Sequence, residues 1–385
     1  MTRKTSLLRF ALILPVIALF ALSCNQSPEA KFEKEMTAFM QDISCPGLSV
    51  AVVKDNQIIY NHSFGVKSLE TNEPVTNESI FRIASISKSF SATSMMQLIE
   101  AGKVSLDTDV SDLMGFPVRN PKFPERVITL RMLMSHTSSL NDNEGYFTLD
   151  VINPEKNENW ANCYNDYEPG TGYEYCNLNF NMTGTFIERI SGERFDQYVK
   201  HHVLDPLSLY GGYCVDSLDA SKFVMLYAYN DSTKTMDPEP EAYAPRREQI
   251  TNYVMGYSTP VFSPTGGMKI SALDLAKYMM MHMNYGTSPL NNVTIISEES
   301  SKTMQTPLSS NENYGLALNQ TDRFTPGITL VGHTGGAYGL RSAMYFNPAE
   351  KYGFTIISSG SKETATNGQD ILRGSIELMY NNFIK

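Results

Sequence analysis

A serine and a lysine stand three positions apart in the segment FRIASISKSF, as Ser85 and Lys88. The run that follows them predicts a helix, on which two residues with this spacing share a face. A lysine amine can take the proton of a neighbouring serine hydroxyl, but only where burial or nearby charges make the ammonium acidic. The same spacing recurs at Ser359 and Lys362, after an expected strand, and there we read it as a surface turn. The pair alone therefore indicates an activated nucleophile without establishing one.

Four further segments accompany this pair along the chain. They are, in order, GKVSLDTDVSDLM, ITLRMLMSHTSSL, PGTGYEYCN and GHTGG. Together with FRIASISK they resemble the serine β-lactamase and penicillin-binding family, in the branch that contains class C β-lactamases, DD-peptidases and related esterases. The resemblance extends from about residue 32 to the C-terminus.

The resemblance implies a role for each matching residue. Ser85 corresponds to the family's nucleophile and Lys88 to its proton partner, while Tyr175 is similar to the phenolic general base. Asn177 would orient the substrate and Lys88 through hydrogen bonds. A tyrosine with a pKa of about 10 becomes a base only where cations lower that value, and we expect Lys88 to supply the charge.

The GHTGG segment is similar to the family's strand edge beside the substrate. The resemblance places His333, Thr334 and Gly335 in substrate binding. It also implies an oxyanion hole formed by the backbone N–H groups of Ser85 and Gly336. Glycines let a strand approach a substrate closely and aim an N–H at developing negative charge.

The chain departs from the family pattern at two of these positions. His333 stands where efficient class C β-lactamases have lysine, and a mostly neutral histidine resembles the DD-peptidase and esterase members. Arg341 is a candidate to hold a substrate carboxylate instead; its alternative reading is a surface arginine on a strand. Cys176 replaces the usual serine after Tyr175 and is either a disulfide partner or a small apolar filler. His136, in SHTSSL, is expected to be structural.

The N-terminus reads as an export signal. Three basic residues precede the apolar run FALILPVIALFAL, which is too short to span a membrane and ends close to Cys24. This order resembles a bacterial lipoprotein signal, which implies removal of residues 1–23, lipidation of Cys24 and a tether over residues 24–30. The protein would then be exported and lipid-anchored in the bacterial cell envelope, in the periplasm or at the outer membrane. The alternative is an ordinary cleaved signal with a chance cysteine.

The composition limits the kinds of molecule that the protein can bind. The net charge of −10 and the lack of a basic patch exclude a nucleic-acid partner, and 42% apolar with 19% charged residues is typical of a folded globular chain. We expect no cofactor and no metal, because no Cys-x-x-Cys occurs and the adjacent His201 and His202 cannot readily share one ion. Four cysteines allow three disulfide pairings that the sequence does not rank: Cys45, Cys163, Cys176 and Cys214.

The elements that must position these residues suggest an α+β fold, the β-lactamase/transpeptidase type that the resemblance implies. An antiparallel sheet flanked by helices is expected from residues 31–84 and 262–385, and a mostly helical insertion from 85–261, with the site between them. The polar stretch 141–173 is either a surface loop or a wall over the site, and 237–249 is expected to be an exposed loop. Strand pairs are predicted at 48–66 and 341–360, and further helices at 30–42, 177–190, 195–203, 271–286 and 365–383.

The expected function is hydrolysis of an amide or ester through an acyl-enzyme, with a small-molecule or peptide acyl donor. The histidine at 333 favours a DD-peptidase or esterase over an efficient β-lactamase. One alternative is an acyltransferase, because an alcohol or amine can attack the same acyl-serine as water. Another is an envelope protein that binds peptidoglycan or senses β-lactams. Pure binding is disfavoured, since it needs no activated serine.

Overall fold

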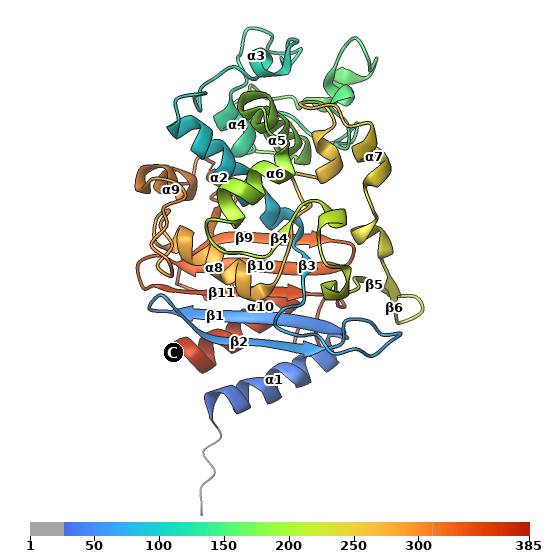
Figure 1. Ribbon diagram of the computed structural model, residues 1–385, viewed down its shortest axis with the longest axis vertical. Helices are drawn as coiled ribbons and strands as arrows, with labels where there is room; N and C mark the ends of the chain where they lie inside the picture. Colours follow the sequence, from blue (N-terminus) through green and yellow to red (C-terminus); the bar gives the residue numbers. More distant parts are fainter. Residues whose placement is uncertain (1–26, 310) are drawn as a thin grey trace, which may run out of the picture.

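The computed structural model describes residues 27–309 and 311–385, so the expected signal peptide and Cys24 lie outside the described residues. Within those ranges no helix is long and apolar enough to cross a membrane. Figure 1 shows a sheet with helices on both faces and, above it, a mostly helical group. The predicted α+β class is confirmed.

The main sheet has six antiparallel strands in the order β2-β1-β11-β10-β9-β8. Strands from the two ends of the chain therefore pair in its middle, where Val50 of β1 lies opposite Ile356 of β11. The two predicted hairpins are β1–β2 and β10–β11. The strands are β1 (Gly47–Lys54), β2 (Gln57–Gly65), β8 (Asn319–Thr321), β9 (Leu330–Ala337), β10 (Leu340–Asn347) and β11 (Tyr352–Ser358).

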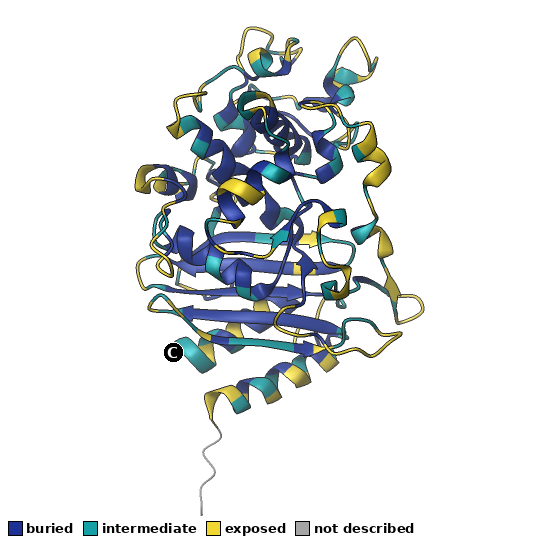
Figure 2. Cartoon of the chain, viewed as in Figure 1, coloured by how far each residue is buried: buried dark blue, intermediate teal, exposed yellow. Residues whose placement is uncertain are grey.

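Different helices cover the two faces of this sheet. Successive side chains of a strand point to opposite faces. Val50 accordingly packs into an apolar cluster with α1 (Pro28–Asp42) and α10 (Ile371–Met379), whereas Ala51 belongs to the cluster that contains α8 (Ala272–Met283). The inner strands β1 and β11 are thus buried on both sides, whereas the edge strand β2 is partly exposed (Figure 2).

The helical group is built around α2 (Ser87–Glu100), which packs against α5 (Asn177–Ser191) and α6 (Phe195–Val199). Most residues of α2 are buried, including its serines, so the helix that carries Lys88 is central rather than peripheral. The other helices are α3 (Val110–Met114), α4 (Leu130–Met134), α7 (Arg247–Thr251) and α9 (Glu298–Gln305); the other strands are β3 (Phe81–Arg82), β4 (Gly211–Gly212), β5 (Tyr227–Asn230), β6 (Thr235–Pro238) and β7 (Lys269–Ile270).

Two local predictions are wrong. Ser359 does not lie in a surface turn: it is buried, and its Oγ accepts a hydrogen bond from Gly47 N at 2.9 Å, which ties the end of β11 to β1. Residues 237–249 are not wholly an exposed loop, because they include the end of β6 and most of α7. Tyr243 anchors this segment by stacking on Phe223, with ring centroids 4.6 Å apart.

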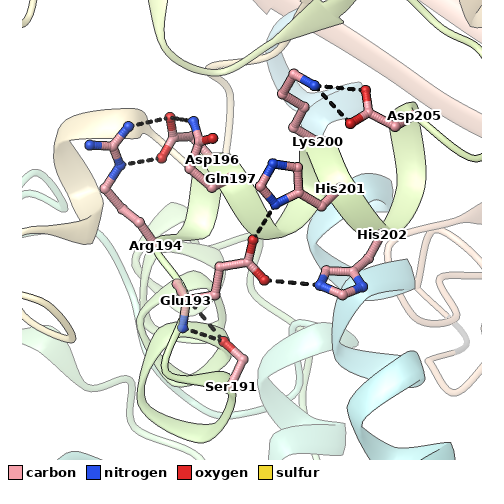
Figure 3. Close-up of polar contacts among 9 residues, drawn as sticks. All are labelled: Ser191, Glu193, Arg194, Asp196, Gln197, Lys200, His201, His202 and Asp205. Atoms are coloured by element: carbon pink, nitrogen blue, oxygen red, sulfur yellow. Dashed lines mark hydrogen bonds and ion pairs between the residues drawn. The ribbon is translucent and has the colours of Figure 1, made fainter.

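The cysteines form no disulfides among the described residues, and the adjacent histidines contact a carboxylate. Cys45, Cys163, Cys176 and Cys214 are buried free thiols. The carboxylate of Glu193, which precedes α6, contacts both His201 and His202, which follow it; His202 Nε2 is 2.9 Å away (Figure 3). No cluster of potential metal ligands is found among the described residues.

Candidate active site

Ser85 lies in a short 3-10 turn between β3 and α2. Ala84 precedes it with φ of 47°, in the left-handed region, a strained backbone of the kind that clusters at functional sites. Neighbouring segments hold the turn from two sides. Ile83 N donates to Met268 O at 3.0 Å, and Ile83 O accepts from Ser342 Oγ at 2.8 Å. The position of Ser85 is therefore fixed by the strands around it.

Lys88 lies in the first turn of α2 and is fully buried. Its Nζ is 3.0 Å from Ser85 Oγ, 2.9 Å from Asn177 Oδ1 and 3.0 Å from the carbonyl oxygen of Thr265. Burial lowers the pKa of Lys88 to about 7, and the nearby Asp142 charge opposes this effect only in part. The ammonium is therefore acidic enough to lose its proton near neutral pH.

Asn177 is the first residue of α5, and Asp142 fixes its orientation. The backbone N–H and the side-chain amide of Asn177 both donate to Asp142 Oδ2, at 2.8 and 2.9 Å, while Leu178 N donates to Oδ1 at 3.0 Å. The carboxylate thus also satisfies the N-terminus of the helix. Because the amide nitrogen is used in this way, Oδ1 faces Lys88 and accepts from Thr265 Oγ1 at 2.8 Å.

Tyr175 lies between Lys88 and His136. Lys88 Nζ is 4.7 Å from the centroid of the phenol ring, and the His136 ring is 4.3 Å away. Burial raises the pKa of Tyr175 above its ordinary value, and a hydrogen bond with Ser85 offsets this only in part. The expectation that Lys88 lowers this pKa is wrong, because the lysine lies over the ring face and burial acts on both groups. Tyr175 is a neutral phenol in this environment.

His136 supports the loop that carries Tyr175. The imidazole is buried, and its Nδ1 accepts a hydrogen bond from Cys176 N at 3.2 Å. Burial and the neighbouring Lys88 lower the pKa of His136 well below its ordinary value, so the ring is neutral. These contacts agree with the structural role expected for His136.

Strand β9 packs against the Ser85 turn at Gly335. A Cβ atom at this position would lie 2.2 Å from Ile83 O and 2.4 Å from Ser342 Oγ, so only glycine fits. The next residue, Gly336, lines the same 290 Å³ pocket as Ser85. The two residues predicted to form the oxyanion hole are therefore on the wall of one pocket, and their role stays a prediction.

Both ring nitrogens of His333 already have protein partners. Nε2 is 2.8 Å from Tyr314 Oη, and Nδ1 contacts the carbonyl oxygen of Thr334. Because a carbonyl oxygen only accepts, Nδ1 carries the proton and Nε2 accepts the Tyr314 hydroxyl hydrogen. Burial lowers the pKa of His333 to about 3, so the ring has no charge near neutral pH. Its direct contact with substrate, like that of Thr334, stays a prediction.

Arg341 is exposed on β10, directly opposite Gly336 of β9. Its guanidinium lies over that glycine, since a Cβ atom on Gly336 would be 2.6 Å from Nη1. Arg341 also lines a 670 Å³ depression together with Thr334 and Gly335. Its exposure fits a surface arginine, and its position beside Gly336 fits a residue that binds a substrate carboxylate. The role of Arg341 therefore stays a prediction.

Two pockets meet at Tyr175. The 290 Å³ pocket is lined by Ser85 and Tyr175, and Tyr146 and Phe147 from the polar stretch 141–173 form part of its wall. Tyr175 also lines a second pocket, of 260 Å³. Its lining residues are mainly aromatic and come from the 173–175 segment, the 312–319 segment and β9: Tyr173, Tyr175, Glu312, Tyr314, Asn319, His333 and Thr334.

Sequence reasoning missed three residues of this site. Asp142, which orients Asn177, directly follows the SHTSSLN segment, so its signal was a carboxylate beside a recognised motif. Arg82 lines the Ser85 pocket and lies inside FRIASISK, where only the serine and lysine drew attention. Thr265, which bonds both Lys88 and Asn177, had no signal in the sequence.

Comparison with known proteins agrees with this architecture. Penicillin-binding protein 4 of Amycolatopsis lactamdurans is 26% identical over 352 residues, which cover 87% of this chain and 86% of that protein. An octameric penicillin-binding protein homologue from Pyrococcus abyssi has a TM-score of 0.71 and 24% identity, covering 91% of this chain and 76% of that one. EstCE1, a hydrolase with promiscuous acyltransferase activity, has a TM-score of 0.71 and 18% identity, covering 91% and 99%. The model of the Beta-lactamase family matches residues 32–375, and the chain belongs to that family.

Proposed function

We propose that the chain is a serine hydrolase that cleaves an amide or ester bond through an acyl-enzyme on Ser85. The arrangement around Lys88 carries this proposal. A neutral amine has two hydrogens and one lone pair. The amide oxygen of Asn177 and the carbonyl oxygen of Thr265 only accept, so they take both hydrogens and leave the lone pair facing Ser85 Oγ. A base that activates a nucleophile needs this orientation, with its lone pair directed at the hydroxyl group.

In the first half-reaction, Ser85 Oγ bonds to the carbonyl carbon of the donor while its proton moves to Lys88 Nζ. The electron pair of the carbonyl moves to oxygen, where the N–H groups of Ser85 and Gly336 would stabilise the charge. The carbonyl then re-forms and the bond to the leaving group breaks. The departing amine or alcohol takes the Tyr175 phenol proton, which the Lys88 ammonium replaces.

In the second half-reaction, water attacks the acyl-serine. Its proton passes to the Lys88 amine, and the tetrahedral species collapses with the Ser85 oxygen as leaving group. That oxygen takes the proton back from the ammonium, and the carboxylic acid is released. The buried neutral phenol of Tyr175 suits a proton carrier rather than a permanent phenolate.

The neutral His333 supports a peptidase- or esterase-like activity over an efficient β-lactamase. A β-lactam presents a carboxylate near this position in the family, and a lysine there would hold it by charge. Here the ring is buried, uncharged and bonded to Tyr314. We therefore expect slow or no turnover of β-lactams.

Acyl transfer is the second candidate. The aromatic pocket beyond Tyr175 offers a place for an apolar alcohol or amine on the side from which the leaving group departs. The similar fold of EstCE1, with its promiscuous acyltransferase activity, is consistent with this reading. Product analysis with a panel of alcohols and amines separates the two candidates, because only a transferase gives new esters or amides.

Labelling of Ser85 tests the proposal. The protein is incubated with a fluorophosphonate and separately with a penicillin, and the adducts are mapped by mass spectrometry, with Ser85→Ala as control. A fluorophosphonate adduct on Ser85 that is lost in the variant is the expected result. The lifetime of a penicillin adduct then distinguishes a lactamase from a peptidase or a sensor. A folded protein that neither probe labels would leave a binding role as the better reading.

We also propose that the protein is exported and held at a bacterial envelope membrane by a lipid on Cys24. The support is the order of basic residues, apolar run and cysteine in the first 24 residues. Labelled palmitate is expected to enter the full chain but not Cys24→Ala. Equal incorporation into both would contradict the anchor.

A further inference from the structure

Arg82 places a cationic side chain beside Ser85. It ends β3, three positions before the serine, and its side chain lines the 290 Å³ pocket although the residue is only 8% exposed. Its Nε donates to Gly266 O at 2.8 Å and its Nη1 to Ala242 O at 3.4 Å. Over residues 27–309 and 311–385, Nη2 forms no hydrogen bond. One edge of the guanidinium is therefore available to the pocket.

No carboxylate neutralises this arginine in the described part of the chain. Its basic neighbours are Lys269, which lies opposite it in the β3–β7 pair, and Arg246, whose charge acts on it. Burial and the Arg82 charge lower the pKa of Lys269 well below its ordinary value. Lys269 is buried as well, and its Nζ donates only to a backbone oxygen, that of Tyr213, at 2.7 Å. The nearby Asp216 is taken up by the side chain of Arg247 and the backbone of Arg246. Burying a charge without a partner is costly, so an anionic ligand would stabilise this region.

The rest of the pocket suits a chain that leads to such an anion. Besides Tyr175, three aromatic side chains line it: Tyr146, Phe147 and Tyr338. The Arg82 guanidinium lies over the Tyr338 ring, 4.9 Å from its centroid, which holds the planar group in a fixed orientation. Phe147 is 70% exposed at this wall, so its ring is accessible to a ligand in the pocket.

The chemistry of the acyl-enzyme assigns the two pockets. The acyl chain stays bonded to Ser85, whose own pocket also contains Gly336 and Arg82. The leaving group must face Tyr175, the proposed proton donor, which lines both pockets; the 260 Å³ pocket does not include Ser85, so it suits the leaving group. The Arg82 pocket is thus the place for the acyl chain.

We propose that Arg82 binds a carboxylate at the far end of the acyl chain, so that the preferred donor is a monoester or monoamide of a dicarboxylic acid. The planar fork of an arginine matches a carboxylate, and such charge-assisted bonds are among the strongest in proteins. The inference rests on the proposed acyl-enzyme mechanism and adds the substrate class to it.

Matched esters test this inference. The donors are para-nitrophenyl monoesters of succinic, glutaric and adipic acid, each compared with the isosteric chain in which an isopropyl group replaces the free carboxylate. We expect kcat/KM to favour the best acidic ester by about 10- to 100-fold, as for a hydrogen bond to a charged group. In Arg82→Gln this ratio falls to about 1, and Arg82→Lys, which keeps the charge without the fork, is intermediate.

Arg341→Gln separates the two arginines that could bind the carboxylate, because Arg341 is the other arginine near Gly336. The preference is expected to persist in this variant; its loss there instead of in Arg82→Gln would overturn the assignment. If both Arg82 variants fail to fold, the kcat/KM ratio of the wild-type protein still tests the inference. A wild-type ratio of about 1 for all three chain lengths contradicts the inference, and a preference that survives Arg341→Gln supports it.

Labelling with the neutral fluorophosphonate separates failure of the Arg82 proposal from failure of the proposed acyl-enzyme function. A protein that is labelled on Ser85 and cleaves the uncharged esters, but shows no preference for the acidic ones, refutes only the role of Arg82. A folded protein with an unreactive Ser85 refutes the proposed function itself.

Discussion

A single oxygen of Asp142 accepts hydrogen bonds from both the backbone and the side-chain nitrogen of Asn177, at 2.8 and 2.9 Å. This contact decides which end of the Asn177 amide faces Lys88. With the nitrogen held by the carboxylate, the oxygen takes a hydrogen from the amine, and the lone pair is left for Ser85. In the proposed mechanism, Asp142 is therefore a positioning residue that acts on Lys88, the proposed base, through the side chain of Asn177.

Replacing Asp142 by asparagine is expected to slow acylation of Ser85 by about 100-fold, because the Asn177 amide can then turn and misplace the amine. The rate of fluorophosphonate labelling, followed by intact mass, measures this. Asp150→Asn is the matched control, since that carboxylate is partly exposed and pairs with Lys156 at 2.8 Å away from the site. Equal rates in the two variants would remove Asp142 from the mechanism.

Gly335→Ala is expected to lower the free energy of unfolding by about 1–3 kcal/mol, because the new methyl group overlaps the backbone oxygen of Ile83. The Ser85 turn would also shift, so labelling should slow. Urea denaturation and the labelling rate measure the two effects. Gly212→Ala is the control, since the nearest atom to its added Cβ is 3.8 Å away. A Gly335 variant as stable and as reactive as this control would contradict the close packing of β9 on the turn.

The lowered pKa of Lys88 makes a prediction about stability. Between about pH 7 and the ordinary lysine pKa of about 10.4, the unfolded state holds a proton on this residue that the native state has lost. The contribution of Lys88 to the free energy of unfolding therefore rises with pH across this window, by up to about 1.4 kcal/mol per pH unit. The observable is the difference in unfolding free energy between wild type and Lys88→Met, followed by urea denaturation at several pH values. A difference that does not change with pH would mean that Lys88 stays charged.

His333 is expected to remain neutral throughout the physiological range. Burial lowers its pKa to about 3, so protonation occurs only on strong acidification, and the folded state is disfavoured as pH falls towards that value. Assigned imidazole resonances, followed by NMR from about pH 8 to pH 5, should not shift, whereas a free histidine titrates near 6.5. A midpoint of about 6 to 7 for His333 would restore the possibility of a cation at this position.

The sequence was enough to predict that Ser85, Lys88 and Asn177 lie together, because the order of the motifs and the helical spacing identify them. The hairpins β1–β2 and β10–β11 were accessible for a similar reason, since alternating apolar residues flank short polar turns. These features depend on local pattern.

Protonation states could not be predicted from the sequence, because they depend on which residues the folded chain packs around each titratable group. Burial lowers the pKa of Lys88 to about 7 and raises the pKa of Tyr175, and neither shift follows from the motif. The same reason applies to Ser359, which the pattern placed at the surface and the fold buries against Gly47. Arg82 is the clearest case: only the folded chain shows that no carboxylate among residues 27–309 and 311–385 pairs with it.

The pH dependence of Ser85 acylation tests the central claim most directly. The second-order rate of fluorophosphonate labelling, measured between about pH 5 and pH 9, should rise with pH and level off around a midpoint of about 7, as the Lys88 amine loses its proton. Lys88→Ala should lower the rate by more than about 100-fold and abolish that midpoint. A rate that still rises at about pH 9 without levelling off, in wild type and variant alike, would point to a phenolate as the base and contradict the proposed role of Lys88.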